Sequence, residues 1–290
     1  MDSGIPAGLR MHIRWLFCSD RAPGSPRPAK RYADLAVSPD RVLSASAEWI
    51  SPWFPAHSIH NDLGWLEYYL LDGIATVMRV RPGEMTAAEL VPKVLTELWL
   101  QHADKVHWQT GPRYVPSGVD QVVANLGASV HETYDICGYP LDRPLPAVSR
   151  TRGATAYPVR SRDDVAQYER TSALAWGYPP PSEDDIDTTY AGLAEGYFIG
   201  CWGNKPAGAG GYGLVNDVAR FWGTAVVPEF RGRGVYRALV HARMAEARTR
   251  GARLVLVKAR ESTSSPILQR LGFTVYGQQK VWSIRRPDPT

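Results

Sequence analysis

The run Ala225–Val240 constrains the fold of this chain more than any other segment. Its start, Ala225–Val227, is small and β-branched, as buried strands prefer, and Pro228 cannot donate to a strand ladder. Gly232 and Gly234 permit a tight turn whose amides face one point. The apolar residues that follow recur at helical spacing, at Val235, Leu239, Val240 and Met244. The run therefore predicts a strand that passes through a glycine turn into a helix.

The start of this helix is a candidate binding place for phosphate. The helix is expected to end at Gly251, with Arg248 and Arg250 in its last turn. Its first turn would leave backbone amides free beside Arg231 and Arg233. The turn lacks the Lys-Ser/Thr pair of a nucleoside-triphosphate loop. It also lacks the three-glycine spacing and the downstream acid of a dinucleotide fold, so both of these motifs are excluded.

The glycine turn resembles the acyl-CoA signature of the GNAT N-acetyltransferases, Arg/Gln-x-x-Gly-x-Gly/Ala. The segment 231–234 fits that pattern, and Tyr236 departs from its last small position. Pro228 before the turn and Leu271-Gly272-Phe273 after it lie at the distances usual in the family, and the resemblance covers about residues 151 to 285. It implies acetyl-CoA or another acyl-CoA as co-substrate, no metal, and direct attack by an amine in a ternary complex.

The resemblance also implies roles for particular residues. The main chain of Val226 and Val227 would meet the pantetheine arm and contact the thioester oxyanion. The remaining cofactor-binding residues would hold the pyrophosphate, and they are Arg231, Gly232, Arg233, Gly234, Val235 and Tyr236. Ten basic residues against two acids between positions 218 and 260 suit such a polyanion. For Arg243, Arg248 and Arg250, a solvated helix face is the alternative.

The catalytic acid and base cannot be assigned from the motif. The family often carries a tyrosine five positions before the Phe of Leu-Gly-Phe, and Leu268 stands there; Glu261 replaces an Asn seven residues earlier. Ser264 and Ser265 start the same short helix and could reach the sulfur, although helix capping explains both. Tyrosines are the other candidate donors, although each could simply pack in the core, and they are Tyr212, Tyr236 and Tyr276. We keep Ser264 and Tyr276 as catalytic candidates.

An acceptor pocket could be lined by aromatic residues and one acid, which are Trp176, Tyr178, Glu183 and Trp222. The aromatic residues have core packing as an alternative, and Glu183 has a complete explanation as a helix-start acid. No histidine has metal-ligand spacing.

Composition bounds the class of protein. The 290 residues favour about two domains, and 44% hydrophobic content is ordinary for a globular chain. A net charge of +4 without a basic-aromatic run argues against a nucleic-acid partner. The odd, dispersed cysteines Cys18, Cys137 and Cys201 suit reduced thiols, and no segment has the length of a membrane span. We therefore expect a cytoplasmic protein without a membrane partner, and the Ala, Arg, Gly and Pro content fits a bacterial source.

The proline-rich stretch 138–147 predicts a linker that divides the chain into domains at 1–150 and 151–290. The second domain is expected to contain helices at about 162–176, 183–193 and 264–271 besides the motif helix. Its strands are expected at 155–159, 196–202, 207–215, 218–227, 254–257 and 273–284. The first domain repeats this order more faintly: strands at 65–72 and 73–80, helix 85–101, strand 106–109, helix 118–125, Leu126-Gly127-Ala128 and strand 132–137. In this first copy, the segment 81–84 stands where the phosphate turn would be, and it contains only one glycine, no arginine after it, and an acid where an anion would bind.

These patterns predict a mixed α/β chain with the acyl-CoA N-acyltransferase fold. It would contain two tandem copies, the first degenerate, each a mostly antiparallel central sheet flanked by helices. An unrelated N-terminal helix-and-sheet domain is the alternative. The function predicted is acetyl transfer from acetyl-CoA to a primary amine of a small molecule, and the alternative is a non-catalytic acyl-CoA sensor. A homodimer is left open.

Overall fold

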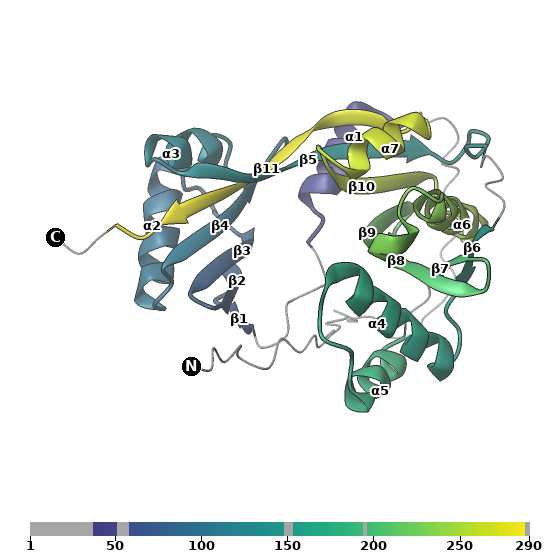
Figure 1. The fold of residues 1–290 in the computed structure, drawn as a ribbon. Coiled ribbons are helices and arrows are strands. Elements are labelled where there is room, and N and C mark those ends of the chain that lie inside the picture. Colours follow the sequence, from purple (N-terminus) through teal and green to yellow (C-terminus); the bar gives the residue numbers. More distant parts are fainter. Residues whose placement is uncertain (1–36, 51–57, 148–152, 194–195, 288–290) are drawn as a thin grey trace, which may run out of the picture.

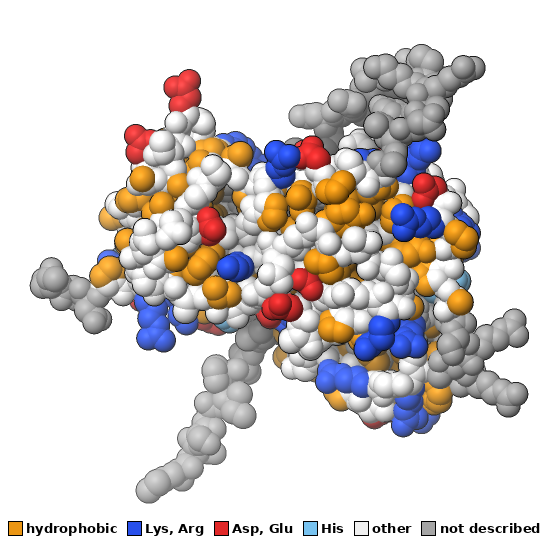
Figure 2. All heavy atoms as spheres, turned by 90° about the horizontal axis from the view of Figure 1, so that it is seen from above, with side chains coloured by type: hydrophobic (Ala, Val, Ile, Leu, Met, Phe, Trp, Pro, Cys, Tyr) orange, Lys and Arg blue, Asp and Glu red, His pale blue; other side chains and the backbone are white. Residues whose placement is uncertain are grey.

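The computed structural model describes residues 37–50, 58–147, 153–193 and 196–287. Within these residues, eleven strands form a single mixed sheet in the order β1-β2-β3-β4-β11-β5-β10-β9-β8-β7-β6 (Figure 1). The chain is therefore mixed α/β, with mostly antiparallel pairing and helices on both faces of the sheet. No described helix combines the length and apolar character needed to cross a bilayer. Figure 2 shows basic and acidic side chains interspersed on one face of the molecule.

The elements of the N-terminal part are α1 (Pro39–Ala47), β1 (Ile59–Asp62), β2 (Leu66–Leu71), β3 (Ile74–Val80), α2 (Ala87–Leu100), β4 (Lys105–Thr110), α3 (Val119–Asn125) and β5 (Ser129–Pro140). Those of the C-terminal part are β6 (Ala154–Pro158), α4 (Arg162–Trp176), α5 (Glu183–Ala191), β7 (Tyr197–Trp202), β8 (Lys205–Val215), β9 (Val218–Val226), α6 (Val235–Thr249), β10 (Leu254–Arg260), α7 (Ser264–Arg270) and β11 (Thr274–Arg285).

The two parts repeat one arrangement. In each, a long helix connects a parallel strand pair, β3–β4 through α2 and β9–β10 through α6. Each short helix that follows ends at a left-handed glycine, Gly127 (φ 79°) or Gly272 (φ 87°). The next amide then donates back across the helix end, from Ala128 to the Val123 carbonyl and from Phe273 to the Leu268 carbonyl, both at 3.1 Å. The tandem order predicted from the sequence is confirmed.

The last strands of the two repeats are exchanged. β5 pairs with β10 of the other repeat, placing Cys137 opposite Val257. β11 pairs with β4, placing Trp282 opposite Trp108, and β5 and β11 pair with each other in the middle (Figure 1). Trp282 and Ile284 of β11 consequently lie in the hydrophobic cluster of the N-terminal part. This exchange joins the two repeats into one sheet.

Helices cover the C-terminal part of the sheet on both faces. α6 and α7 pack on one face, around Leu239, Met244 and Leu268. α4 and α5 pack on the other face, around Tyr168 and Ile186, and α1 covers the same side further along. Side chains of β9 and β10 alternate between these two faces, and this alternation determines which of their residues lie side by side.

Several boundaries differ from the sequence prediction. The expected linker starts inside a strand, because β5 runs on through Pro140. The closing strands are one strand, β11, with two register shifts against β5. α1 and β1 have no counterpart in the prediction. The predicted domain boundary at 150 lies outside the described residues.

Candidate functional site: an open helix start beside two diverging strands

The glycine turn has the geometry that the sequence predicts. β9 ends at Val226, a short 3-10 turn covers Pro228–Phe230, and α6 begins at Val235. Gly232 (φ 76°) and Gly234 (φ 85°) are both left-handed, a conformation that costs other residues about 1 kcal/mol or more. Gly234 is the N-cap of α6 and has no side chain to cap it.

The first amides of α6 are consequently without acceptors. Within the described chain, no group accepts from the backbone amides of Gly232, Gly234, Val235, Tyr236 or Arg237. The first bond into the helix is from the Ala238 amide to the Gly234 carbonyl, at 3.0 Å. The first turn also contains no acid. Amide dipoles that converge in this way form an anion site suited to phosphate.

Two exposed arginines flank these amides. The Nε of Arg231 donates to the Val226 carbonyl at 3.2 Å, which ties the turn back to the end of β9. The guanidinium of Arg233 lies over the rings of Trp202 and Phe230, 5.5 and 5.7 Å from their centroids. Both side chains are thus held beside the turn while their remaining N–H groups face solvent.

β9 and β10 diverge in front of the turn. They pair only from Val218↔Leu254 to Phe221↔Val257. Beyond that, β9 stays on β8, with a bulge at Gly223 (φ 61°), and β10 stays on β5. The edges at 222–226 and 258–260 that would have faced each other form no pair within the described residues, so an extended ligand chain can enter between them.

The two valines predicted to contact the thioester differ in their hydrogen bonds. The Val227 amide donates to the Ala207 carbonyl of β8 at 2.9 Å, so it is not available to an oxyanion, and that part of the prediction is wrong. In an antiparallel ladder, neighbouring residues alternate in direction, so the main chain of Val226 faces away from β8. Val226 keeps its predicted position at the opening.

The basic residues further along α6 do not belong to the turn. Arg243 is fully buried: its Nε and Nη1 donate to the carbonyls of Leu239 and Gly211, at 3.0 and 2.9 Å. Burial lowers the pKa of Arg243 to about 10. Arg248 and Arg250 lie at the opposite end of the helix, roughly 20 Å from the turn at 1.5 Å per residue. None of the three can reach a phosphate there.

The acceptor candidates Trp176, Tyr178, Glu183 and Trp222 are spread over several elements. Trp222 packs edge-on against Tyr197, with ring centroids 5.1 Å apart, between two hydrophobic clusters. Trp176 is 42% exposed at the end of α4. Tyr178 is half-buried, and the charge of Arg260 of β10 acts on its hydroxyl, although burial dominates and raises its pKa. Of the four, Trp222 and Tyr178 lie nearest the diverging strands.

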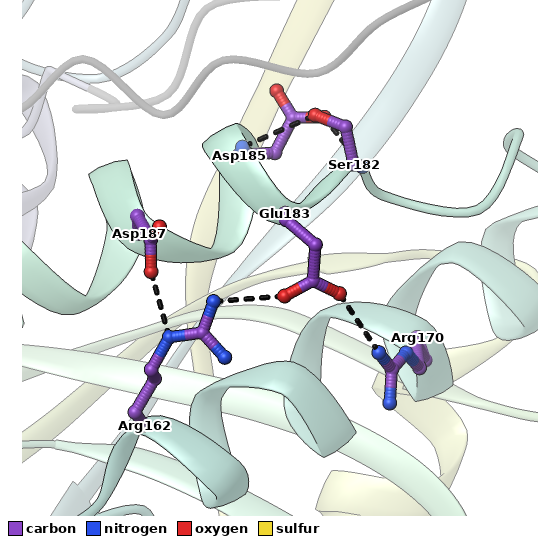
Figure 3. A network of polar contacts seen from close by, with 6 residues as sticks. All are labelled: Arg162, Arg170, Ser182, Glu183, Asp185 and Asp187. Carbon is purple, nitrogen blue, oxygen red and sulfur yellow. Dashed lines mark hydrogen bonds and ion pairs between the residues drawn. The ribbon is translucent and has the colours of Figure 1, made fainter.

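Glu183 belongs to a clamp between α4 and α5 (Figure 3). Its carboxylate pairs with Arg162 at 2.8 Å and with Arg170 at 3.3 Å, and Arg162 also pairs with Asp187 at 2.7 Å. The carboxylate of Asp185, in turn, accepts from the Ser182 hydroxyl at 2.6 Å. These contacts explain Glu183 as a link between two helices.

The candidate acid–base groups are also placed by the structure. Leu268 is fully buried in the core, so the position of the usual family tyrosine holds an apolar side chain. Ser264 is the first residue of α7, and Ser265 does not cap that helix: its hydroxyl donates to Asp135 of β5 at 2.5 Å. Tyr276 packs beside Gly138 on the face covered by α1.

Sequence reasoning missed a pair of cations, Lys258 of β10 and Arg220 of β9. The strand alternation could have indicated them, because every second residue of a buried strand lies on the same face. On β10 these residues are Leu254, Leu256 and Lys258. The ammonium of Lys258 donates to the Trp49 carbonyl at 3.0 Å and to the Tyr114 hydroxyl at 3.2 Å. Lys258 is the first residue of β10 beyond its pairing with β9.

Comparison with known proteins supports the same fold and family. Residues 163–273 match the family model described as "Acetyltransferase (GNAT) family", which is less than half of the chain. Comparison with curated proteins gives no match.

Solved structures with a similar fold include a GCN5-related N-acetyltransferase from Kribbella flavida (TM-score 0.57, 16% identity, 79% of this chain and 90% of that chain) and one from Sphaerobacter thermophilus (0.58, 18%, 78% and 79%). Another is a tandem GNAT protein from the clavulanic acid biosynthesis pathway (0.52, 19%, 77% and 79%). At these identities the likeness concerns the fold. Residues 163–273 thus match the GNAT acetyltransferase family model, and the chain shares its tandem fold with these structures.

Proposed function

We propose that this chain transfers an acetyl or another acyl group from an acyl-CoA to a primary amine of a small molecule, by direct attack in a ternary complex. The observation that carries the proposal is the open start of α6, where five amides lack acceptors next to Arg231 and Arg233. A diphosphate ester supplies the anionic oxygens that these donors need. The gap between β9 and β10 then leads from the diphosphate to the main chain of Val226.

Among the described residues, the position of the usual family tyrosine holds the buried, apolar Leu268 and so supplies no acid for the leaving thiolate. A thiolate is nevertheless a fair leaving group, because a thiol has a pKa of about 8.5. The amine would therefore attack as its neutral form, the oxyanion would be stabilised by main-chain donors at the opening, and the sulfur would leave without an enzymic acid.

The test is calorimetric titration with coenzyme A, followed by an assay of thiol release from acetyl-CoA with and without added amines. Arg231→Glu/Arg233→Glu is expected to weaken binding about 1,000-fold. Arg248→Glu, which changes the charge at the far end of α6, is expected to leave binding unchanged. Equal affinity in the double variant and the native chain would overturn the proposal.

The buried Leu268 favours a second function, a non-catalytic acyl-CoA sensor. Both functions require cofactor binding, so the thiol-release assay separates them. Release that depends on an amine supports the transferase. Tight binding without turnover over a broad amine panel supports the sensor.

A further inference from the structure

Lys258 and Arg220 form a pair of cations that no carboxylate neutralises. Arg220 pairs opposite Leu256, two residues before Lys258, so the two side chains are diagonal neighbours on the face that α1 covers. Neither forms an ion pair within 4.0 Å with any acid among the described residues. Two adjacent positive charges at a half-buried position are unfavourable unless an anion joins them.

Both cations have donors to spare. The Lys258 ammonium has three N–H groups and uses two, toward Trp49 and Tyr114. The Arg220 Nε is buried and has no hydrogen-bond partner among the residues that the structure describes. Buried donors are nearly always satisfied in proteins, so the partnerless Arg220 Nε, beside an ammonium with one N–H to spare, indicates an acceptor that is supplied from outside.

The electrostatics agree with this interpretation. Burial, and secondly the charge of Arg220, lower the pKa of Lys258 to about 7. Burial also lowers the pKa of Arg220, although Glu48 at the end of α1 opposes that effect. The phenol of Tyr114, whose pKa burial raises, stays neutral beside them. Glu48 is thus a nearby negative charge, but it forms no ion pair within 4.0 Å with either cation, so both keep donors for an arriving anion.

A cavity reaches Tyr114, whose hydroxyl accepts from Lys258, although neither Lys258 nor Arg220 lines the cavity itself. This cavity of about 500 Å³ opens between the end of α1, β3, β4 and the following loop. Glu48 and Tyr114 line it, and both interact with the cations. The rest of its wall includes apolar groups of Ile50, Val77 and Trp108. That volume lies within the range of small-ligand sites.

We propose that Lys258 and Arg220 bind a carboxylate on the acceptor, so that the substrate class is an amino acid or a related aminocarboxylate whose apolar part occupies the cavity lined by the N-terminal repeat. This inference rests on the proposed acyl transfer. It gives the N-terminal repeat a role, since Tyr114 and much of the cavity wall come from it. It also places the anchoring charges at the point where β10 leaves β9, next to the expected thioester.

The experiment uses the full chain with acetyl-CoA and two matched panels, the twenty common amino acids and their carboxamides. Thiol release is measured for each. We expect at least one acid to react at least tenfold faster, in kcat/KM, than its amide. Lys258→Met and Arg220→Met should each remove that preference, so that within each variant the acid and its amide react with kcat/KM values that differ less than threefold. Lys205→Met, an exposed lysine at the start of β8, is the matched control.

A binding measurement covers the case without turnover. With coenzyme A present, the ¹³Cε signal of Lys258 is followed against pH while each amino acid is added, and a bound carboxylate should raise the pKa of Lys258. If no acid shifts this signal and none is acetylated, or if the amides serve equally well, the inference is overturned. Coenzyme A binding that still depends on Arg231 and Arg233 would then leave the cofactor proposal standing.

Discussion

The starts of α2 and α6 occupy equivalent places in the two repeats, but α2 has a side-chain cap and α6 has none. At α2, the Thr86 side chain accepts from the Glu89 amide at 3.4 Å, and the Glu89 carboxylate accepts from the Thr86 amide at 2.9 Å. At α6, glycine replaces the capping threonine and Arg237 stands where Glu89 does. The start of α2 is closed by a capping box that carries a negative charge, whereas the start of α6 has no cap and no acid, so its amides are open to an anion.

The largest expected effect is at the open turn. Arg231→Glu/Arg233→Glu should weaken coenzyme A binding about 1,000-fold, because two charge-assisted contacts of about 2 kcal/mol each become repulsive. Calorimetry measures the affinity, and thermal melting checks the fold. A loss of less than threefold would show that the arginines only pack on their neighbours.

The helices α4 and α5 of the C-terminal repeat contain a pH-sensitive acid. Burial, assisted by Asp185 and opposed by a hydrogen bond from Thr189, raises the pKa of Glu169 to about 7. The folded state thus keeps a proton that the unfolded state loses between about pH 4.5 and 7, so stability falls as pH rises through that window. Glu169→Gln should be more stable than the native chain by about 3 kcal/mol at pH 8 and equal to it at pH 4, measured by urea unfolding. A stability difference that does not change with pH would contradict this.

The comparison of the two helix starts can be made within α6 itself. Arg237→Glu places a carboxylate at the third position of α6, where α2 has Glu89. We expect about a tenfold loss of coenzyme A affinity, since an acid at this position competes for the amides and repels phosphate. Arg237→Gln is the control for the lost cation, and it should lose less.

The smallest expected effect is at the closed start of α2. Thr86→Ala removes the capping hydroxyl and should cost about 1 kcal/mol of folding stability in urea unfolding. Coenzyme A affinity should not change, because the capped start of α2 is not part of the proposed cofactor site. An altered affinity would show that the N-terminal repeat is coupled to the cofactor site.

The sequence predicted the site better than the sheet. Gly232, Gly234 and the Leu-Gly-Phe turn act through local backbone rules, so their spacing alone indicated the strand, turn and helix. The exchange of β5 and β11 could not be predicted in this way, since either strand satisfies the same alternating pattern beside β4 or β10. The proximity of Lys258 and Arg220 could likewise not be predicted, because it depends on the pairing of β9 with β10, which places both on the face that α1 covers. Arg243 was predicted to be a phosphate ligand or a solvated residue, because its position in the helix does not indicate that it is buried and donates to the Leu239 and Gly211 carbonyls.

The most direct test of the open helix start is a titration of the ¹⁵N-labelled chain with coenzyme A, followed through backbone amide shifts. The account predicts the largest changes at Gly232, Gly234, Val235 and Tyr236, with the equivalent amides of Ala87 and Glu89 in α2 unmoved. Saturable binding that shifts other amides and leaves those of the α6 start unchanged would contradict it.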